Sequence, residues 1–127
     1  MGVRARLGAV ALACCMVVSG ASAMDIATYD KQRKEPANSQ TQVRLRVYLL
    51  GLGEGLRLAN TVLQQQGQPM LFCATEGTAL LGDDYKKLID AALSESRGSF
   101  ERQELSIEAI MLIGLQQRFP CAPKTPA

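Results

Sequence analysis

Apolar side chains recur at steps of three and four from residue 42 to residue 66, which predicts a long amphipathic helix. The stripe consists of Leu45, Leu49, Leu52, Leu56, Ala59 and Leu63. The glycine and proline of residues 67–69 predict its end. Three glycines, Gly51, Gly53 and Gly55, interrupt the pattern, and each costs about 1 kcal/mol relative to alanine. Close packing of another helix explains them, and a kink or a binding groove is the alternative.

A second helix is predicted for residues 83–96, with Asp83 as its N-cap and an end near Gly98. The charged residues 99–105 fit either a helical turn or a loop. The apolar face of this helix consists of Tyr85, Leu88, Ile89 and Ala92, with Leu93 beside it.

Ser106 is predicted to cap the last helix, in which residues 109–115 carry no polar side chain. A helix that is apolar on all sides is normally buried among others, so we expect it at the centre of the fold. A buried strand is the alternative, but the serine cap and the polar continuation favour a helix. Pro120 ends the helix at Phe119.

The first 23 residues have the layout of a secretory signal peptide, in which two arginines precede the uncharged apolar run of residues 7–18. An Ala-Ser-Ala site follows, and we predict cleavage between Ala23 and Met24. The apolar run is about half of what a spanning helix needs, which argues against an uncleaved anchor. We therefore expect a periplasmic protein with no membrane span in its mature form.

Removal of residues 1–23 also removes Cys14 and Cys15, although lipidation at one of these two is an alternative to cleavage after Ala23. An exported chain left with Cys73 and Cys121 most simply pairs them, because the periplasm is oxidising. Such a disulfide closes a loop of nearly fifty residues and stabilises the fold by about 4 kcal/mol. It would tie the end of the last helix to the loop after the first.

Charge excludes several function classes. The full chain has 14 basic and 12 acidic residues and a net charge of +2. Two basic residues leave with the signal peptide, so the mature chain is nearly neutral. No basic stripe with interleaved aromatic residues exists, which argues against nucleic-acid binding. The chain has no histidine, which excludes a Cys-His nucleophile and leaves too few ligands for zinc.

The carboxylates offer little for catalysis. Asp83 and Asp84 could pair as acid and base, but at a helix start they are more simply a cap and a favourable charge. Glu54 and Glu108 are candidates to face a groove, with a solvated or salt-bridged glutamate as the simpler interpretation. We therefore predict no catalytic residue, no metal site and no cofactor, and hence a protein that is not an enzyme.

These patterns divide the chain into four parts. They are a signal peptide of residues 1–23, a flexible polar segment of residues 24–42, a helical domain of residues 43–121 and a tail of residues 122–127. The predicted fold is all-α, a small bundle of three to five helices closed by one disulfide.

Four segments resemble the Rap/Tai family of small exported helical proteins. They are YLLGLGEGLRLAN, LFC, DYKKLIDAAL and SIEAIMLIGLQQRFPC, and together they span about residues 44–121. The most specific similarities are the Tyr-x-x-Gly motif from Tyr48 to Gly51, the isolated Cys73 and the terminal Phe-Pro-Cys that contains Cys121. The chain departs from the family pattern at Ala74, where many relatives have proline.

The resemblance implies an all-helical, disulfide-linked periplasmic immunity protein of type VI secretion, which blocks a peptidoglycan-cleaving amidase effector. Members of this family are often dimeric, so a homodimer is a possible assembly for this chain. Many relatives carry another cysteine where this chain has Leu45, so a second disulfide is not expected. The matched positions are those of the scaffold, and the residues that contact a partner are therefore unknown.

Three functions remain open from the residues alone. In the first, an inhibitor presents a loop to an enzyme cleft, with residues 64–70 and 94–104 as candidate exposed surfaces. In the second, an acid-stress chaperone releases apolar surface at low pH, where only carboxylates can act as the switch. In the third, a structural subunit self-associates through the last helix or the glycine face.

Overall fold

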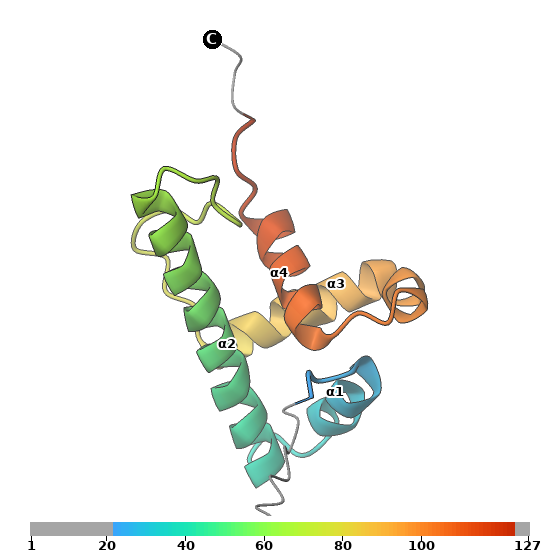
Figure 1. Cartoon of the computed structure of the whole chain (residues 1–127). Helices are drawn as coiled ribbons and strands as arrows, with labels where there is room; N and C mark the ends of the chain where they lie inside the picture. Colours follow the sequence, from blue (N-terminus) through green and yellow to red (C-terminus); the bar gives the residue numbers. More distant parts are fainter. Residues whose placement is uncertain (1–21, 124–127) are drawn as a thin grey trace, which may run out of the picture.

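The computed structural model describes residues 22–123, and these form an all-α fold with no strand among them (Figure 1). This confirms the predicted fold class. The helices are α1 (Ile26–Arg33), α2 (Gln40–Gln65), α3 (Gly82–Arg102) and α4 (Ile107–Arg118). Residues 1–21 of the predicted signal peptide, which include Cys14 and Cys15, lie outside the described residues.

Helix α2 confirms the long amphipathic helix that the apolar spacing predicts. Ser39 caps it, since the Ser39 hydroxyl accepts a hydrogen bond from the backbone N–H of Gln42 at 3.2 Å. Leu45 and Leu49 of the stripe are almost fully buried. Gly67, with φ of +67°, lies in the turn that follows the helix.

The prediction that residues 24–42 form a flexible segment is wrong, because this segment contains helix α1 and the start of α2. Helix α1 begins after Asp25, whose carboxylate accepts the Thr28 N–H at 2.6 Å. Ile26 is 8% exposed and Tyr29 is not exposed at all. Two buried side chains in eight residues that are mostly polar are too few to show a helical period, so the pattern hides the helix.

Helix α3 differs from its prediction at both ends. Its N-cap is Leu81 and not Asp83, because Asp84 accepts the Leu81 N–H at 2.9 Å. The helix also continues past Gly98 to Arg102, across a kink at Ser96, where φ is −137°. The segment of residues 99–105 is thus helical at its start and a turn at its end.

Helix α4 begins at the predicted cap, and the Ser106 hydroxyl accepts the Ala109 N–H at 3.4 Å. It contacts both α3 and α2, and Gly114 lets it approach the Leu88 carbonyl of α3 closely. Leu112 remains half-buried, so α4 is not enclosed on all sides. The most deeply buried side chains of the core are Tyr29, Leu45, Leu49, Tyr85, Ile89, Ile107, Ile110, Met111 and Leu115.

The three glycines of α2 divide into two kinds. Gly53 is buried, and a Cβ added there would overlap the ring of Tyr85 from α3. Close packing therefore explains Gly53. Gly51 and Gly55 lie on the exposed face of α2, where an added Cβ would meet nothing within 4 Å.

Candidate functional site

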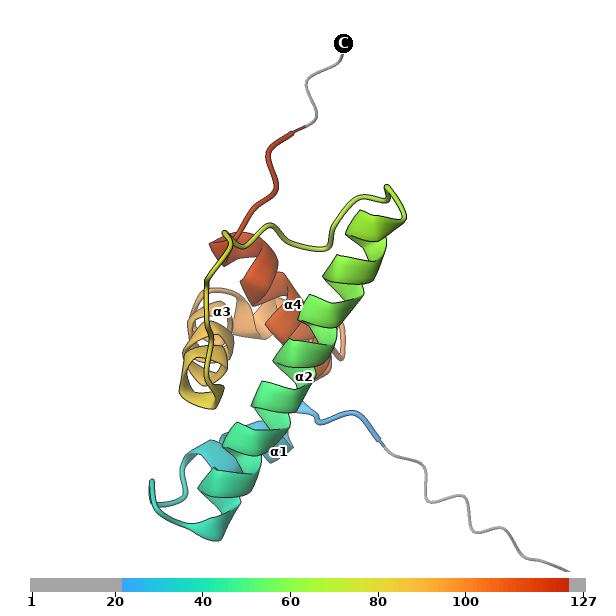
Figure 2. The ribbon, with the colours of Figure 1, turned by 90° about the vertical axis from the view of Figure 1, so that its left-hand side faces the viewer.

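The most unusual exposed feature is the sixteen-residue connection between α2 and α3, residues 66–81, which we call the tethered loop. It contains no helix or strand. Loops of this length in compact domains are uncommon, and ordered ones are usually functional. Figure 2 shows the loop leaving the C-terminal end of α2, crossing near the end of α4 and descending to the start of α3.

Asn60 of α2 clamps the middle of the tethered loop. Its side-chain amide donates to the Phe72 carbonyl at 2.6 Å and accepts the Leu71 N–H at 2.7 Å. Asn60 is only 8% exposed and Phe72 only 2%. Both polar atoms of this buried amide are therefore satisfied by the loop backbone. The Asn60 side chain provides the hydrogen-bond partners that a helix or strand would otherwise give to these two backbone groups.

The end of α4 holds the same part of the loop from the other side. The structure contains the predicted disulfide between Cys73 and Cys121, with 4.8 Å between the Cα atoms. The Cys73 N–H donates to the Phe119 carbonyl at 2.8 Å, and Gln116 donates to the Leu71 carbonyl at 3.2 Å. One covalent bond and two hydrogen bonds thus join the loop to the last helix.

The second half of the loop is fixed by Arg57 of α2, which donates to the Thr78 carbonyl at 2.8 Å. Glu54, a candidate groove residue, is exposed and lies 3.8 Å from Arg57 as its ion-pair partner. A hollow of about 420 Å³ separates this part of the loop from α2. Residues 66–69, which we call the loop tip, are exposed ahead of the first attachment point, and residues 74–77 are exposed between the attachment points at Cys73 and Thr78.

The other candidate surface, residues 94–104, serves mainly to hold α1. Arg97 donates to both carboxylate oxygens of Asp30, at 2.8 and 3.3 Å, and Phe100 is buried in the core. The Arg97 hydrogen bonds outweigh partial burial and, with Arg33, hold the pKa of Asp30 below its usual range. Arg97 and Phe100 are therefore engaged within the fold, whereas residues 101–104 remain exposed.

Each of the predicted carboxylates has a different partner. Asp84 caps α3, and exposed Asp83 lies 3.9 Å from Arg46. Glu108 sits at the start of α4 and accepts hydrogen bonds from the Tyr48 hydroxyl and from the Met24 N–H. Among residues 22–123, no group of three or more possible metal ligands comes together.

Burial raises the pKa of Glu108, but the hydrogen bonds from the Tyr48 hydroxyl and from the Met24 N–H outweigh it. The net pKa of this carboxyl lies below its usual range, and Glu108 is therefore ionised at neutral pH. The pKa of Tyr48 is raised to about 12, by burial and by the Glu108 carboxylate, so its hydroxyl stays a donor.

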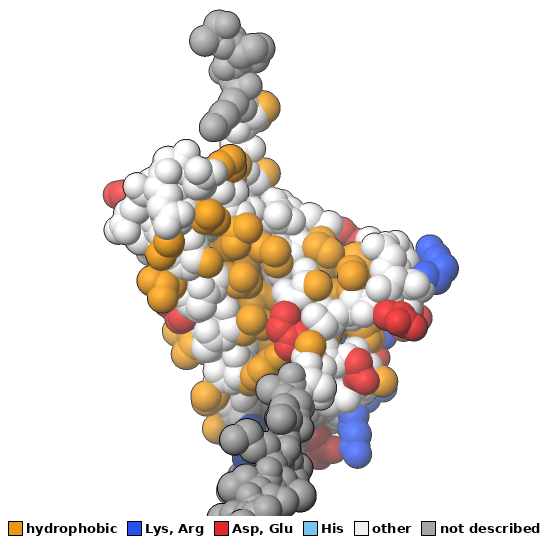
Figure 3. Space-filling model, in the orientation of Figure 1, with side chains coloured by type: hydrophobic (Ala, Val, Ile, Leu, Met, Phe, Trp, Pro, Cys, Tyr) orange, Lys and Arg blue, Asp and Glu red, His pale blue; other side chains and the backbone are white. Residues whose placement is uncertain are grey.

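An apolar strip runs upward from this contact along the junction of α2 and α4. Tyr48 and Glu108 face each other, and one turn further along each helix come half-buried Leu52 and Leu112. Leu56 continues the strip toward the tethered loop. Figure 3 shows apolar side chains gathered over this junction.

No helix in the described part of the chain is both long enough and apolar enough to cross a bilayer. Comparisons with family models, with curated proteins and with solved structures found no match for this chain.

Proposed function

We propose that this chain is an exported binding protein of the immunity class, without chemistry of its own, that neutralises a peptidoglycan-cleaving amidase. The observation that carries the proposal is the tethered loop, which is exposed at its tip and fixed by α2 and α4. The resemblance to the Rap/Tai family supports the same assignment and supplies the class of partner.

The tethered loop is suited to inhibition because it is already fixed in one conformation before it binds. A loop that is already ordered loses little conformational entropy when it enters a cleft, so more of the contact energy appears as affinity. Complexes of enzymes with protein inhibitors commonly form with little movement of the interface backbone. Asn60, Arg57 and the disulfide fix the loop at points on both sides of the exposed residues 74–77.

Two features of the chain support a periplasmic location. A disulfide that stabilises a small domain persists in an oxidising environment such as the periplasm. The first 23 residues carry the signal-peptide layout that would deliver the chain there. A peptidoglycan amidase acts in this compartment, so inhibitor and enzyme would meet.

The test uses the mature chain (residues 24–127) with its disulfide intact. It is mixed with each of a panel of purified peptidoglycan amidases of type VI secretion systems. Release of soluble fragments from isolated cell-wall sacculi measures amidase activity. We expect at least one amidase to lose its activity at an equimolar ratio. Gln68→Arg, at the exposed tip, should weaken this inhibition at least tenfold. Gln103→Arg makes the same change at the far end of α3 and should leave inhibition unchanged.

Two outcomes would contradict the proposal. One is that no amidase in the panel is inhibited. The other is that Gln68→Arg and Gln103→Arg inhibit as well as the unchanged chain, which would place the contact surface away from the loop tip.

A self-associating structural protein is the second candidate, and the outer face of α2 favours it. Val47, Leu58 and Val62 are 64%, 65% and 42% exposed, and they align with Gly51 and Gly55 on one face. Small residues between apolar ones allow a second helix to approach closely. A dimer in sedimentation analysis that Leu58→Glu dissociates would support this role, whereas a monomer at millimolar concentration would remove it.

A further inference from the structure

Met24, the residue after the predicted cleavage site, is held on three sides. Its N–H donates to Glu108 Oε1 at 3.2 Å, and its carbonyl accepts the Ile107 N–H at 2.8 Å. Its side chain packs against the hydrophobic core. Ser22 and Ala23, directly before it, are exposed. The chain therefore changes from exposed to anchored at the bond between Ala23 and Met24.

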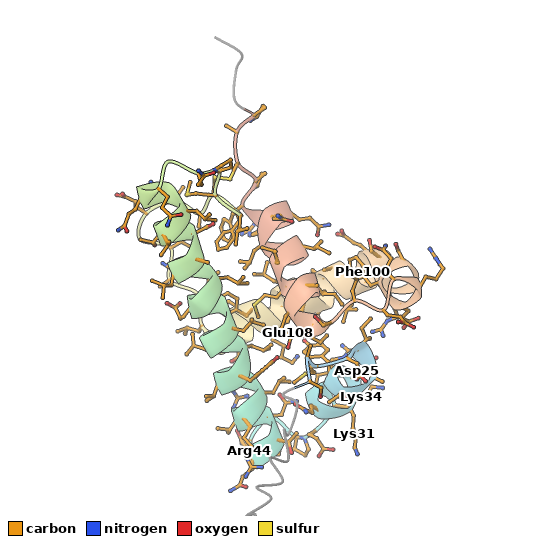
Figure 4. All side chains as sticks on the ribbon, viewed as in Figure 1. Asp25, Lys31, Lys34, Arg44, Phe100 and Glu108 are labelled. Atoms are coloured by element: carbon orange, nitrogen blue, oxygen red, sulfur yellow. A yellow bond between two sulfur atoms is a disulfide. The ribbon has the colours of Figure 1, made fainter. Side chains whose placement is uncertain are left out.

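The Glu108 carboxylate can accept further hydrogen bonds beside the Met24 nitrogen. Oε1 accepts from Tyr48 and from Met24, whereas Oε2 is buried and has no hydrogen-bond partner among the described residues. A buried carboxylate oxygen without a donor is unfavourable, because it has lost its hydration without replacement. Figure 4 shows Glu108 below α4, facing the space between α2 and the segment that leads into α1.

We propose that Glu108 is the binding site for the α-ammonium group of Met24, which is created when the signal peptide is removed. The inference rests on the export part of the proposed function and extends it to the mature N-terminus. Met24 N then carries three donors in place of one, and it can donate to Oε2 as well as to Oε1. The bond from a neutral N–H to the carboxylate thereby becomes an ion pair between two charged groups.

The chemistry of cleavage supplies both the charge and the donors. Water adds across the peptide bond, so that its oxygen joins the Ala23 carbonyl carbon and the C–N bond breaks. The Met24 nitrogen leaves as an amine and is protonated at neutral pH, since an unperturbed α-amino group has a pKa near 8. The new Ala23 carboxylate departs with the signal peptide. The mature chain is thereby stabilised over its precursor.

The experiment is a double-mutant cycle on the oxidised protein. One change is the start of the chain, at Met24 or at Ser22, because two extra residues convert the Met24 nitrogen back to an amide. The other change is Glu108→Gln, which keeps an acceptor but removes the charge. Urea unfolding measures the equilibrium constant of each of the four proteins. Glu95→Gln, at an exposed position of α3, is the matched control.

We expect removal of Ser22 and Ala23 to lower the unfolding constant about tenfold, which is about 1.4 kcal/mol, when Glu108 is present. The same trimming should have no effect in the Glu108→Gln protein, and the Glu95→Gln protein should behave like the unchanged chain. An equal effect of trimming with and without Glu108 would overturn the proposal.

A second measurement needs no substitution, so it still decides the matter if Glu108→Gln does not fold. The α-amino group of native Met24 should react with an acylating reagent at least tenfold more slowly than in the urea-unfolded chain. Equal rates would contradict the proposed site. Sequencing the N-terminus of the protein made in cells tests cleavage separately. A chain that still begins at Met1 would overturn the export assignment and leave the measured coupling intact, whereas cleavage at another bond would overturn the proposed role of the Met24 ammonium group.

Discussion

Gly53→Ala is the sharpest perturbation that this fold offers. The added methyl group would overlap the ring of Tyr85, which is fully buried and cannot swing into solvent. Gly51 and Gly55 lie two residues before and two residues after Gly53 on the same helix. A methyl group added at either position would meet nothing within 4 Å. One chemical change at three neighbouring positions should therefore have opposite effects.

The magnitudes follow from two opposing terms. Alanine is favoured over glycine inside a helix by about 1 kcal/mol. Overpacking a rigid core costs about 1–3 kcal/mol, and the overlap with a whole ring lies at the upper end of that range. Gly53→Ala should therefore destabilise the fold by about 2 kcal/mol. Gly51→Ala and Gly55→Ala should each stabilise it by about 0.5–1 kcal/mol.

Urea unfolding of the oxidised chain, followed by the circular dichroism of its helices, measures all three free energies of unfolding. Tyr85→Leu provides the internal control, because leucine lacks the outer ring carbons that the new methyl group would overlap. In that background Gly53→Ala should cost at least 1 kcal/mol less than it costs alone. A neutral or stabilising Gly53→Ala would refute the close packing of α2 and α3 described above.

Three further predictions concern the attachments of the loop and of α1. Asn60→Ala should cost about 2–3 kcal/mol in urea unfolding, because it leaves the Leu71 N–H and the buried Phe72 carbonyl without a partner; a cost below 0.5 kcal/mol would argue against the clamp. Reduction of the disulfide, which joins residues 48 positions apart, should cost about 4 kcal/mol, and unchanged stability in reductant would contradict this. Arg97→Gln should lower the free energy of unfolding at pH 7 by about 0.5–1 kcal/mol, discounted for exposure. Because the pKa of Asp30 is depressed in the folded state, its contribution is present above the ordinary carboxyl pKa and is lost as pH falls through the folded one. The Arg97→Gln difference should therefore vanish in strong acid, and a constant difference would contradict the ion pair.

The sequence predicts those parts of the fold whose signal is periodic or local. The stripe from Leu45 to Leu63 gives α2, the serine at position 106 caps α4, and two remaining cysteines give one disulfide. Each of these follows from residues that are close in sequence or unique in the chain. The length of α3 was underestimated, because Arg97 and Gly98 look like an ending, whereas the burial of Phe100 extends the helix.

The missed features depend on contacts between distant residues. Helix α1 exists because Tyr29 is buried against the core and donates to Asp90 at 2.8 Å. Asn60 is a lone polar residue on an apolar stripe, and its role appears only when the loop folds back beside it. Such an asparagine is a usable signal, since an apolar helix face rarely keeps an amide without a structural partner.

The first and last segments of the described fold are attached to the core by different chemistry, and this separates the inhibitor role from the acid-stress chaperone role. Asp30 and Glu108 hold α1 and the segment before it, and both carboxyls have depressed pKa values. Both contributions are lost as pH falls through the folded pKa values, so acid should loosen α1 first. Asn60 and the disulfide do not titrate in acid and should keep the loop in place. An acid-stress chaperone would hold clients only below the pH at which α1 detaches, because the apolar surface beneath Ile26 and Tyr29 is covered above it. An inhibitor that acts through the tethered loop would bind its enzyme at neutral pH.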